Sequence, residues 1–345
     1  MMRAGARVQQ LVALVLFAHS VMSAQTKRVV IDTAHVCSAC RLTFDSVATL
    51  ELLDRDGRPQ RIRDVIAPTV GRLVVLSRNL PMPVFSSAGR LIDSTGWEGG
   101  VMRAPPIAQA VGPRGDQFFF GDSRVFVFDS SGRFRRSMTL RNNLRRPVIL
   151  SDGKIVGMLP LILPSSTSKG SVMDLPLFRL HDTTGAELRG IGSATVDADA
   201  VLFAGKGGTM WTARFAPYEL KQWSQTGELL RVVNRPMAGF GGQQFLGDSA
   251  IQPRLIDAHQ DNAGLIWVAY LGSVRKPGCQ QVAARCWDST VDVLDPDTGE
   301  LITKGRLPIL ASALLDHGYV SALLDPATDR RIAVVYRGRL TRPGR

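Results

Sequence analysis

The chain has 345 residues, of which 45% are hydrophobic, and its 33 glycines and 19 prolines are spread along it, which favours a globular protein without long helices. Its net charge is +12, but 35 of the 42 basic residues are arginines scattered along the chain without interleaved aromatic residues. Scattered charge supplies only non-specific, salt-sensitive attraction, so the composition argues against nucleic acid as the partner and makes an acidic envelope polymer the better of the two.

The first 24 residues have the order of a secretory signal peptide. Arg3 and Arg7 precede an apolar run over 11–18, and small residues around Ala24 precede a polar segment. That run is too short for the roughly 20 residues that cross a bilayer, and no later run is long enough. We therefore expect cleavage near Ala24 and an exported protein, periplasmic or extracellular, that has no membrane span and is monomeric.

One unit recurs along the rest of the chain. It consists of a Gly or Asp turn, an apolar strand that often holds an aromatic residue, a second strand, a turn that ends in glycine, and a third strand. Five copies of its middle strand are visible, at 71–76, 116–120, 153–157, 208–212 and 264–269.

The hairpin that follows each middle strand is equally regular. Residues alternate between apolar and polar on both sides of a short Asp/Ser/Thr-Gly turn, which is typical of strands with one buried face. A glycine at the end of such a turn supplies the positive φ that closes the hairpin. These glycines are Gly89, Gly132, Gly185, Gly227 and Gly299. A four-stranded repeat of about 40 residues predicts a propeller blade.

The two ends of the chain are predicted to form one blade together. Residues 319–324 and 331–336 resemble two strands of a blade that stops early, while 47–53 is a strand without inner partners. Pairing them closes the ring and removes exposed sheet edges. The sequence thus predicts an all-β, six-bladed propeller of four-stranded antiparallel blades over 44–340. An N-terminal tail with C-x-x-C (25–43) precedes it and a basic tail (341–345) follows. An open β-sandwich is disfavoured by five units in phase.

Two segments resemble the six-bladed propellers of the NHL-repeat and related exported bacterial type. Residues 257–268 (DAHQDNAGLIWV) are similar to that family's strand, Asp-turn-Gly, Trp-Val signature, and 125–134 (VFVFDSSGRF) to its hairpin. The likeness covers roughly residues 44–340 and is a blade pattern, not a catalytic motif. It implies the fold and a range of functions, including ligand or protein binding, lactone or ester hydrolysis, and amidating-lyase chemistry, with a channel metal in the enzymes.

The four cysteines favour two local disulfides, Cys37–Cys40 and Cys279–Cys286. A tetrahedral zinc site would use other spacings, because zinc ribbons do not have the six-residue gap of the second pair. In an oxidising compartment an even number of cysteines points to disulfides instead. Cross-pairing stays open, since the N-terminal strand would lie next to the fifth blade.

Few residues suggest chemistry. His259 lies between Asp257 and Asp261 at a strand end, where it could bind a metal or relay a proton, although a turn histidine satisfied by hydrogen bonds is the simpler interpretation. His35 and His181 are expected in solvent, and His317 stands alone in the sequence.

A metal has one other candidate site. Asp197 and Asp199, with His259, could hold Ca²⁺ or another divalent metal, but no D-x-D-x-D-G loop is present, and no cofactor is predicted. The chain has no G-x-S-x-G elbow and no phosphate-binding glycine loop. The tryptophans are expected to pack between blades instead of forming a stacking platform: Trp211, Trp223, Trp267 and Trp287.

The sequence favours an exported, non-catalytic propeller that binds a protein or small ligand at one mouth of its channel, because loops of all blades converge there. The alternative is a metal-dependent hydrolase or lyase, resembling lactonases or amidating lyases. That alternative requires at least three His, Asp, Glu or Asn side chains in one axial pocket. A structural role in the envelope ranks third.

Overall fold

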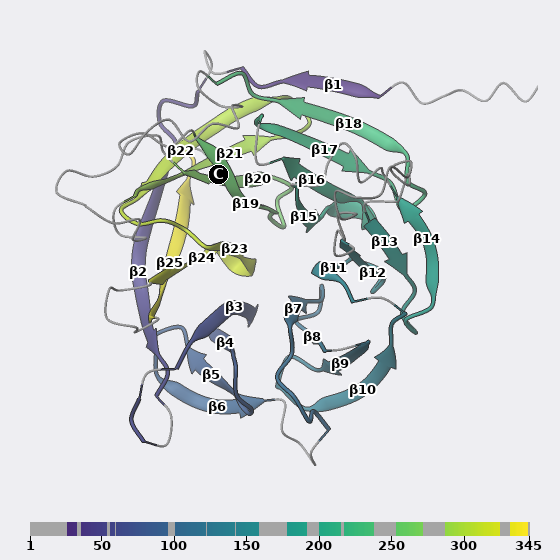
Figure 1. The fold of residues 1–345 in the computed structure, drawn as a ribbon. Helices are drawn as coiled ribbons and strands as arrows, with labels where there is room; N and C mark the ends of the chain where they lie inside the picture. The colour runs from purple at the N-terminus through teal and green to yellow at the C-terminus, as the bar shows by residue number, and fades with distance from the viewer. Residues whose placement is uncertain are drawn as a thin grey trace, which may run out of the picture.

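The computed structural model describes thirteen stretches of the chain: residues 26–32, 36–53, 56–58, 60–95, 101–121, 123–141, 143–158, 178–191, 200–214, 217–237, 253–271, 287–324 and 332–343. Their strands form six antiparallel four-stranded sheets arranged in a ring around a central axis (Figure 1), and one sheet gains a fifth strand. The predicted six-bladed β-propeller is confirmed.

Three blades come from the first half of the ring, each with its innermost strand first. Blade A consists of β3 (Ile62–Thr69), β4 (Arg72–Ser77), β5 (Met82–Ser86) and β6 (Leu91–Thr95). Blade B consists of β7 (Ala108–Val111), β8 (Gln117–Phe120), β9 (Arg124–Phe128) and β10 (Phe134–Thr139). Blade C consists of β11 (Arg145–Ile149), β12 (Ile155–Met158), β13 (Phe178–His181) and β14 (Glu187–Ile191).

The other three blades complete the circle. Blade D consists of β15 (Ala200–Ala204), β16 (Met210–Arg214), β17 (Glu219–Trp223) and β18 (Leu229–Asn234). Blade E consists of β19 (Arg254–Gln260), β20 (Ile266–Leu271), β21 (Ser289–Asp295) and β22 (Glu300–Leu307). Blade F consists of β23 (Ala313–Leu315), β24 (Tyr319–Leu324), β25 (Ile332–Thr341) and β2 (Arg41–Glu51). Short 3₁₀ turns, η2 (Lys206–Gly208) and η4 (Asp316–Gly318), follow β15 and β23.

The turn glycines fix where each hairpin closes. All five glycines predicted between third and fourth strands have positive φ, from 77° at Gly299 to 95° at Gly185. An L side chain at such φ values is strained, so glycine is the residue that closes these turns without cost. At Gly185 a Cβ would also lie 2.5 Å from the carbonyl oxygen of Thr139 in the neighbouring blade. The same glycines therefore let adjacent blades pack closely.

The core consists of six apolar layers, one between each pair of neighbouring blades. The D–E layer, for example, contains Trp211 and Tyr218 of blade D with Ile266 and Val268 of blade E. Equivalent layers join the other blades around the ring. The four tryptophans are at most 9% exposed. Trp211, Trp223 and Trp267 belong to layers between blades, as predicted, whereas Trp287 packs on Leu271 of its own blade.

Blade F closes the ring with strands from both ends of the chain. The N-terminal strand β2 is its outermost strand and pairs antiparallel with β25 along ten residue pairs, from Arg41↔Thr341 to Glu51↔Ile332. Figure 1 shows the purple β2 beside the yellow β25. The predicted closure by terminal strands is confirmed.

The segment ahead of β2 adds two features. β1 (Lys27–Val30) pairs in parallel with β18 and extends blade D to five strands, while Val29 and Ile31 are buried in the D–E layer. Cys37 and Cys40 form a disulfide with an S–S distance of 2.07 Å, as predicted. Cys279 and Cys286 lie outside the described residues, as does the predicted signal peptide. Among the described residues, no helix is long and apolar enough to cross a membrane.

Ring closure generates the first prediction. Deleting residues 26–56 removes β2, exposes the paired edge of β25 and opens the apolar layer between blades F and A, so we expect aggregation and loss of a cooperative thermal transition. The matched control deletes only residues 26–32, which removes β1 but keeps the β2–β25 pair. That control is expected to stay soluble with a lowered Tm in a calorimetric scan. A shorter chain without β2 that melts like the full protein would contradict the closure.

Candidate functional site

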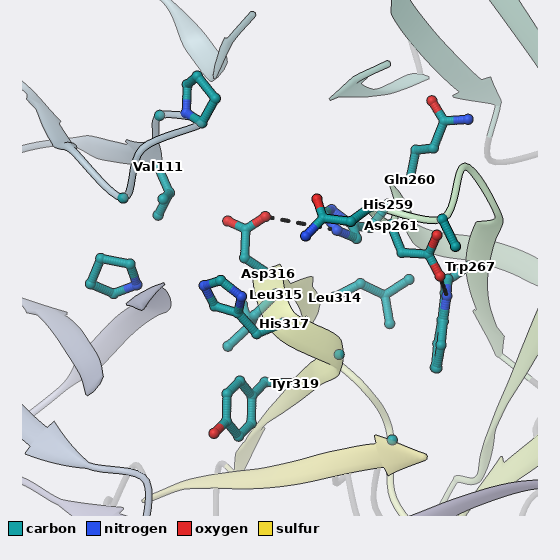
Figure 2. Close-up of a pocket in the computed structure, with 18 residues that line it drawn as sticks. Val111, His259, Gln260, Asp261, Trp267, Leu314, Leu315, Asp316, His317 and Tyr319 are labelled. Atoms are coloured by element: carbon teal, nitrogen blue, oxygen red, sulfur yellow. Dashed lines mark hydrogen bonds and ion pairs between the residues drawn. The ribbon is translucent and has the colours of Figure 1, made fainter. Parts of the chain in front are cut away.

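The innermost hairpin turns of several blades surround a pocket at one mouth of the channel. The pocket has a volume of about 420 Å³ and is lined by the turn after β7, the turn after β19, η4, and Pro68 near the end of β3. These segments belong to blades A, B, E and F, which are adjacent only because the ring is closed. We call this cavity the mouth pocket (Figure 2).

Two histidines and two carboxylates, those of Asp261 and Asp316, line the mouth pocket. His259 Nε2 lies 3.7 Å from Asp316 Oδ1, and their side chains are 25% and 39% exposed. His317, the next residue in η4, has a φ of 62° and also lines the pocket, as Figure 2 shows. His259 and His317 are 58 residues apart in the sequence, but His259 lies near the end of β19 in blade E and His317 lies in η4 of the neighbouring blade F. The pair is exposed enough to exchange its contact for one with a ligand.

Asp261 has a structural role. Its Oδ1 accepts a hydrogen bond from the Leu265 amide, and its Oδ2 accepts one from Trp267 Nε1, both at 2.9 Å. These bonds close the β19–β20 turn and orient the buried Trp267 side chain. Of the three predicted candidates in this segment, Asp261 therefore stabilises the turn, while Asp257 and His259 line the axial cavity described next.

A second cavity, the axial channel, runs along the innermost strands of all six blades. Its volume is about 340 Å³, and it joins the mouth pocket at His259 and Asp316. Its polar lining includes Asp64 on β3, Gln109 on β7, Arg146 on β11 and Asp257 on β19. Asp257 Oδ2 accepts a hydrogen bond from the Leu314 amide of blade F at 2.7 Å, so the carboxylate also ties two blades together.

β-Bulges place three of these charged side chains. The register of β3 shifts between Ile62 and Asp64, that of β11 between Arg145 and Val148, and that of β19 between Leu255 and Asp257. A bulge adds one residue to a strand and re-aims a side chain. In these three blades, a charged residue consequently lies at the bulge and lines the channel.

The sequence carried a signal for these residues. Asp64, Arg146 and Asp257 each stand seven positions before the glycine of the first hairpin turn, at Gly71, Gly153 and Gly264. In blade B, whose inner pair has a regular register, Gln109 stands six positions before Gly115. The phase of the turn glycines therefore identifies the channel residues once one extra residue is allowed for a bulge.

Burial in the channel raises the pKa of both carboxyl groups. Desolvation raises the pKa of Asp257 from its ordinary 3.8 to about 7, against lowering by the Leu314 amide and the Arg146 charge. Desolvation likewise raises the pKa of Asp64 to about 6, against lowering by the Val65 amide, the Gln109 amide and Arg146. The charge of Asp64 also raises the pKa of Asp257. Near neutral pH the channel thus holds carboxyls that can gain and lose protons.

The remaining sequence predictions have different outcomes. His181 was expected in solvent, but it is fully buried at the end of β13, because the hairpin turn begins one residue later, and desolvation lowers its pKa. Asp197, Asp199 and His35 lie outside the described residues. No group of three or more His, Cys, Asp or Glu side chains suited to a metal occurs in the stretches that the structure describes. Sequence reasoning missed Asp64, Gln109, Arg146 and Asp316, and did not connect His317 with His259.

Comparison with known proteins supports the architecture. No protein-family model and no curated protein sequence matches the chain. A candidate exported protein from Bacteroides fragilis matches it with a TM-score of 0.55 and 12% identity, over 91% of this chain and 99% of that one. A member of the DUF4221 family from Bacteroides vulgatus matches with a TM-score of 0.56 and 12% identity, over 88% and 98%. The chain is a six-bladed β-propeller. At such identities the likeness extends to the fold alone.

The raised carboxyl pKa values predict how stability depends on pH. Because both values lie above 3.8, the native state holds these protons more tightly than the unfolded state, and this stabilisation is lost as pH rises through about 7. Asp257→Asn keeps an acceptor for the Leu314 amide and removes the cost of ionisation. We expect it to raise the free energy of unfolding at both pH values, and by on the order of 1–3 kcal/mol more at pH 8 than at pH 5.

Urea unfolding at both pH values measures this effect. The control is Asp45→Asn, which replaces a carboxylate that is 53% exposed on β2 and whose partner Arg339 is also exposed. It is expected to change the pH dependence by no more than a few tenths of a kcal/mol. If Asp257→Asn left the difference in the free energy of unfolding between pH 5 and pH 8 unchanged, the inference that Asp257 is protonated in the native channel would be wrong.

Proposed function

We propose that this protein is an exported binding protein that takes a small polar ligand, or a side chain of a partner protein, in the mouth pocket. The observation that carries the proposal is the convergence of turns from four blades on one cavity that holds the exposed His259–Asp316 pair. A cavity of about 420 Å³ falls within the range of small-molecule sites. Loops on a rigid scaffold are where propellers and other stable folds place recognition.

The pocket's chemistry suits a ligand with both hydrogen-bond donors and acceptors. Asp316 supplies a carboxylate, and His259 and His317 each supply ring nitrogens that can donate or accept. The buried surfaces of Leu314 and Leu315 provide an apolar floor. This combination favours binding of a polar compound with one apolar side over binding of a bare ion.

Export is supported by two independent features. The first 24 residues have the composition of a signal peptide, and the Cys37–Cys40 disulfide fits an oxidising compartment. The structural neighbour from Bacteroides fragilis is itself described as a candidate exported protein. We propose that the ligand is met outside the cytoplasm.

A hydrolase or lyase is the second candidate, and one observation favours it. Asp257, with a pKa of about 7, could donate or accept a proton at neutral pH, and His259 and two further Asp side chains line the axial channel with it. A metal-dependent form would need ligands beyond the described residues, with Asp197 and Asp199 as its candidates. Turnover of a lactone or ester that is lost in Asp257→Asn, while ligand binding persists, would support this candidate.

A ligand screen tests the binding proposal. We expect compounds from a polar fragment library to raise the Tm of the mature protein. Asp316→Asn or His259→Gln should lower the binding affinity of these compounds by about tenfold or more, which corresponds to about 1.4 kcal/mol. Asp45→Asn on the outer strand β2 is the matched charge control and should bind like the parent protein. Equal binding by Asp316→Asn and Asp45→Asn would place the ligand elsewhere.

A further inference from the structure

The end of the channel opposite the mouth pocket carries a concentration of arginines. All six innermost strands run toward the mouth pocket, because the turns that follow them lie on its side. Their first residues therefore lie at the opposite end. There β3 contributes Arg63, β11 begins with Arg145 and Arg146, and β19 begins with Arg254, and all four residues are exposed. The fold thus brings these four arginines, which come from three separate segments of the sequence, to one end of the channel.

Blades B and C are also basic. Residues 101–158, which form blade B and the inner half of blade C, hold ten Lys and Arg against four Asp and Glu, a net charge of +6. Half of the chain's net charge of +12 is therefore carried by about a sixth of its length. Some of these charges, such as Arg114 and Arg135, lie on the side of the mouth pocket, so the field attracts anions to this part of the ring at both of its ends.

Two side chains just inside this end could hold an anion directly. Arg146 lies at the bulge of β11 and lines the channel. Its φ of 47° is unusual for a residue other than glycine. Gln109 lines the same cavity, is only 7% exposed, and interacts through its amide with the Asp64 carboxyl. A buried amide N–H needs an acceptor, so an oxyanion in the channel can take that role when Asp64 is protonated.

The carboxyl groups make this end of the channel sensitive to pH. Among the described residues, the charged and titratable groups that line the channel are Asp64 of β3, Arg146 of β11, Asp257 and His259 of β19, and Asp316 of η4. With pKa values of about 6 and 7, Asp64 and Asp257 are both largely neutral at pH 5 and both ionised at pH 8. The charge beside Arg146 consequently becomes more positive by nearly two units as the pH falls.

We propose that the arginine end of the axial channel is a binding site for a small oxyanion, a carboxylate or a tetrahedral oxyanion, held by Arg146 and the Gln109 amide and bound more tightly at acidic pH. The site goes beyond the proposed function of the mouth pocket, since it lies at the other end of the channel and uses other residues. Arg146 can form charge-assisted, bidentate hydrogen bonds with such a group.

Sulfate is the probe, because its charge stays at −2 between pH 5 and pH 8. Calorimetric titration of the mature protein at constant ionic strength should show one sulfate bound at pH 5, with an affinity at least about tenfold weaker at pH 8. Arg146→Asn, which tolerates positive φ, should weaken binding at pH 5 by about tenfold or more. The control Arg136→Asn removes the same charge from an exposed position on β10 and should bind like the parent protein.

The acidic residues give a second, independent test. The double variant Asp64→Asn/Asp257→Asn should bind sulfate at pH 8 as tightly as the parent protein does at pH 5, and its affinity should no longer change with pH. Asp45→Asn, which removes an exposed carboxylate from the outer strand β2, should keep the parent's pH dependence. This arm remains decisive if Arg146→Asn does not fold, because both Asn side chains keep an acceptor for the amides that Asp64 and Asp257 bind.

Three results would overturn the proposal. These are no sulfate binding at pH 5, equal weakening by Arg136→Asn and Arg146→Asn, or an unchanged pH dependence in the double Asn variant. Competition with succinate then separates the two sources of the anion: displacement of sulfate supports a carboxylate ligand, and no displacement supports a tetrahedral oxyanion. Because the fragment screen reads out His259 and Asp316, its failure leaves the sulfate results interpretable on their own.

Discussion

The pairing of β2 with β25 is the constraint on which the other features of the structure depend. Ten residue pairs join strands whose sequence positions differ by up to 300 residues. This pairing has a large entropic cost for a chain of this length, and it is offset only because it also completes the apolar layers on both sides of blade F. Without it, five blades would form an arc with two open edges, and no channel would exist.

The closed ring brings the site residues to one axis. Asp257 of blade E accepts a hydrogen bond from the Leu314 amide of blade F, and His259 meets Asp316 across the same boundary. Asp64 on the other side of blade F comes close enough to raise the pKa of Asp257. These interactions join blades A, E and F, which are neighbours only when the ring is closed. The pKa of Asp257 therefore depends on whether blade F has formed.

The sequence contained enough information for the blades but not for the register within them. Turn glycines such as Gly89 and Gly299 mark positions that require positive φ, and period-two alternation marks the strands, so blade number and closure could be predicted from local patterns. Bulges at Asp64 and Asp257 could not, because a bulge is a property of two paired strands and shifts side chains by one position. His181 shows the same limit: a shift of one residue at the strand end turned an expected solvent histidine into a buried one.

Contacts between blades were also beyond the sequence pattern. Arg235, just after β18, forms a buried ion pair with Asp292 of β21, and the rings of Tyr218 and Tyr270 lie 5.6 Å and 5.9 Å from its guanidinium carbon. Each residue alone looks like an ordinary charged or aromatic position. A buried charge is tolerated only when its partner is fixed in place, and that partner comes from another blade.

The parallel direction of the six innermost strands explains why the channel has two chemically different ends. One end is built from hairpin turns, where Asp, Gly and His are favoured by their backbone conformations, and this end supplies His259, Asp316 and His317. The other end is built from strand starts, which tolerate long exposed side chains, and it supplies Arg63, Arg145 and Arg254. Asp64 and Asp257 lie along the channel between them, where desolvation keeps their protons near neutral pH. Because the six innermost strands all run in the same direction, the two ends of the channel differ in charge. Asp64 and Asp257 lie between these ends, where the charges of both can affect them.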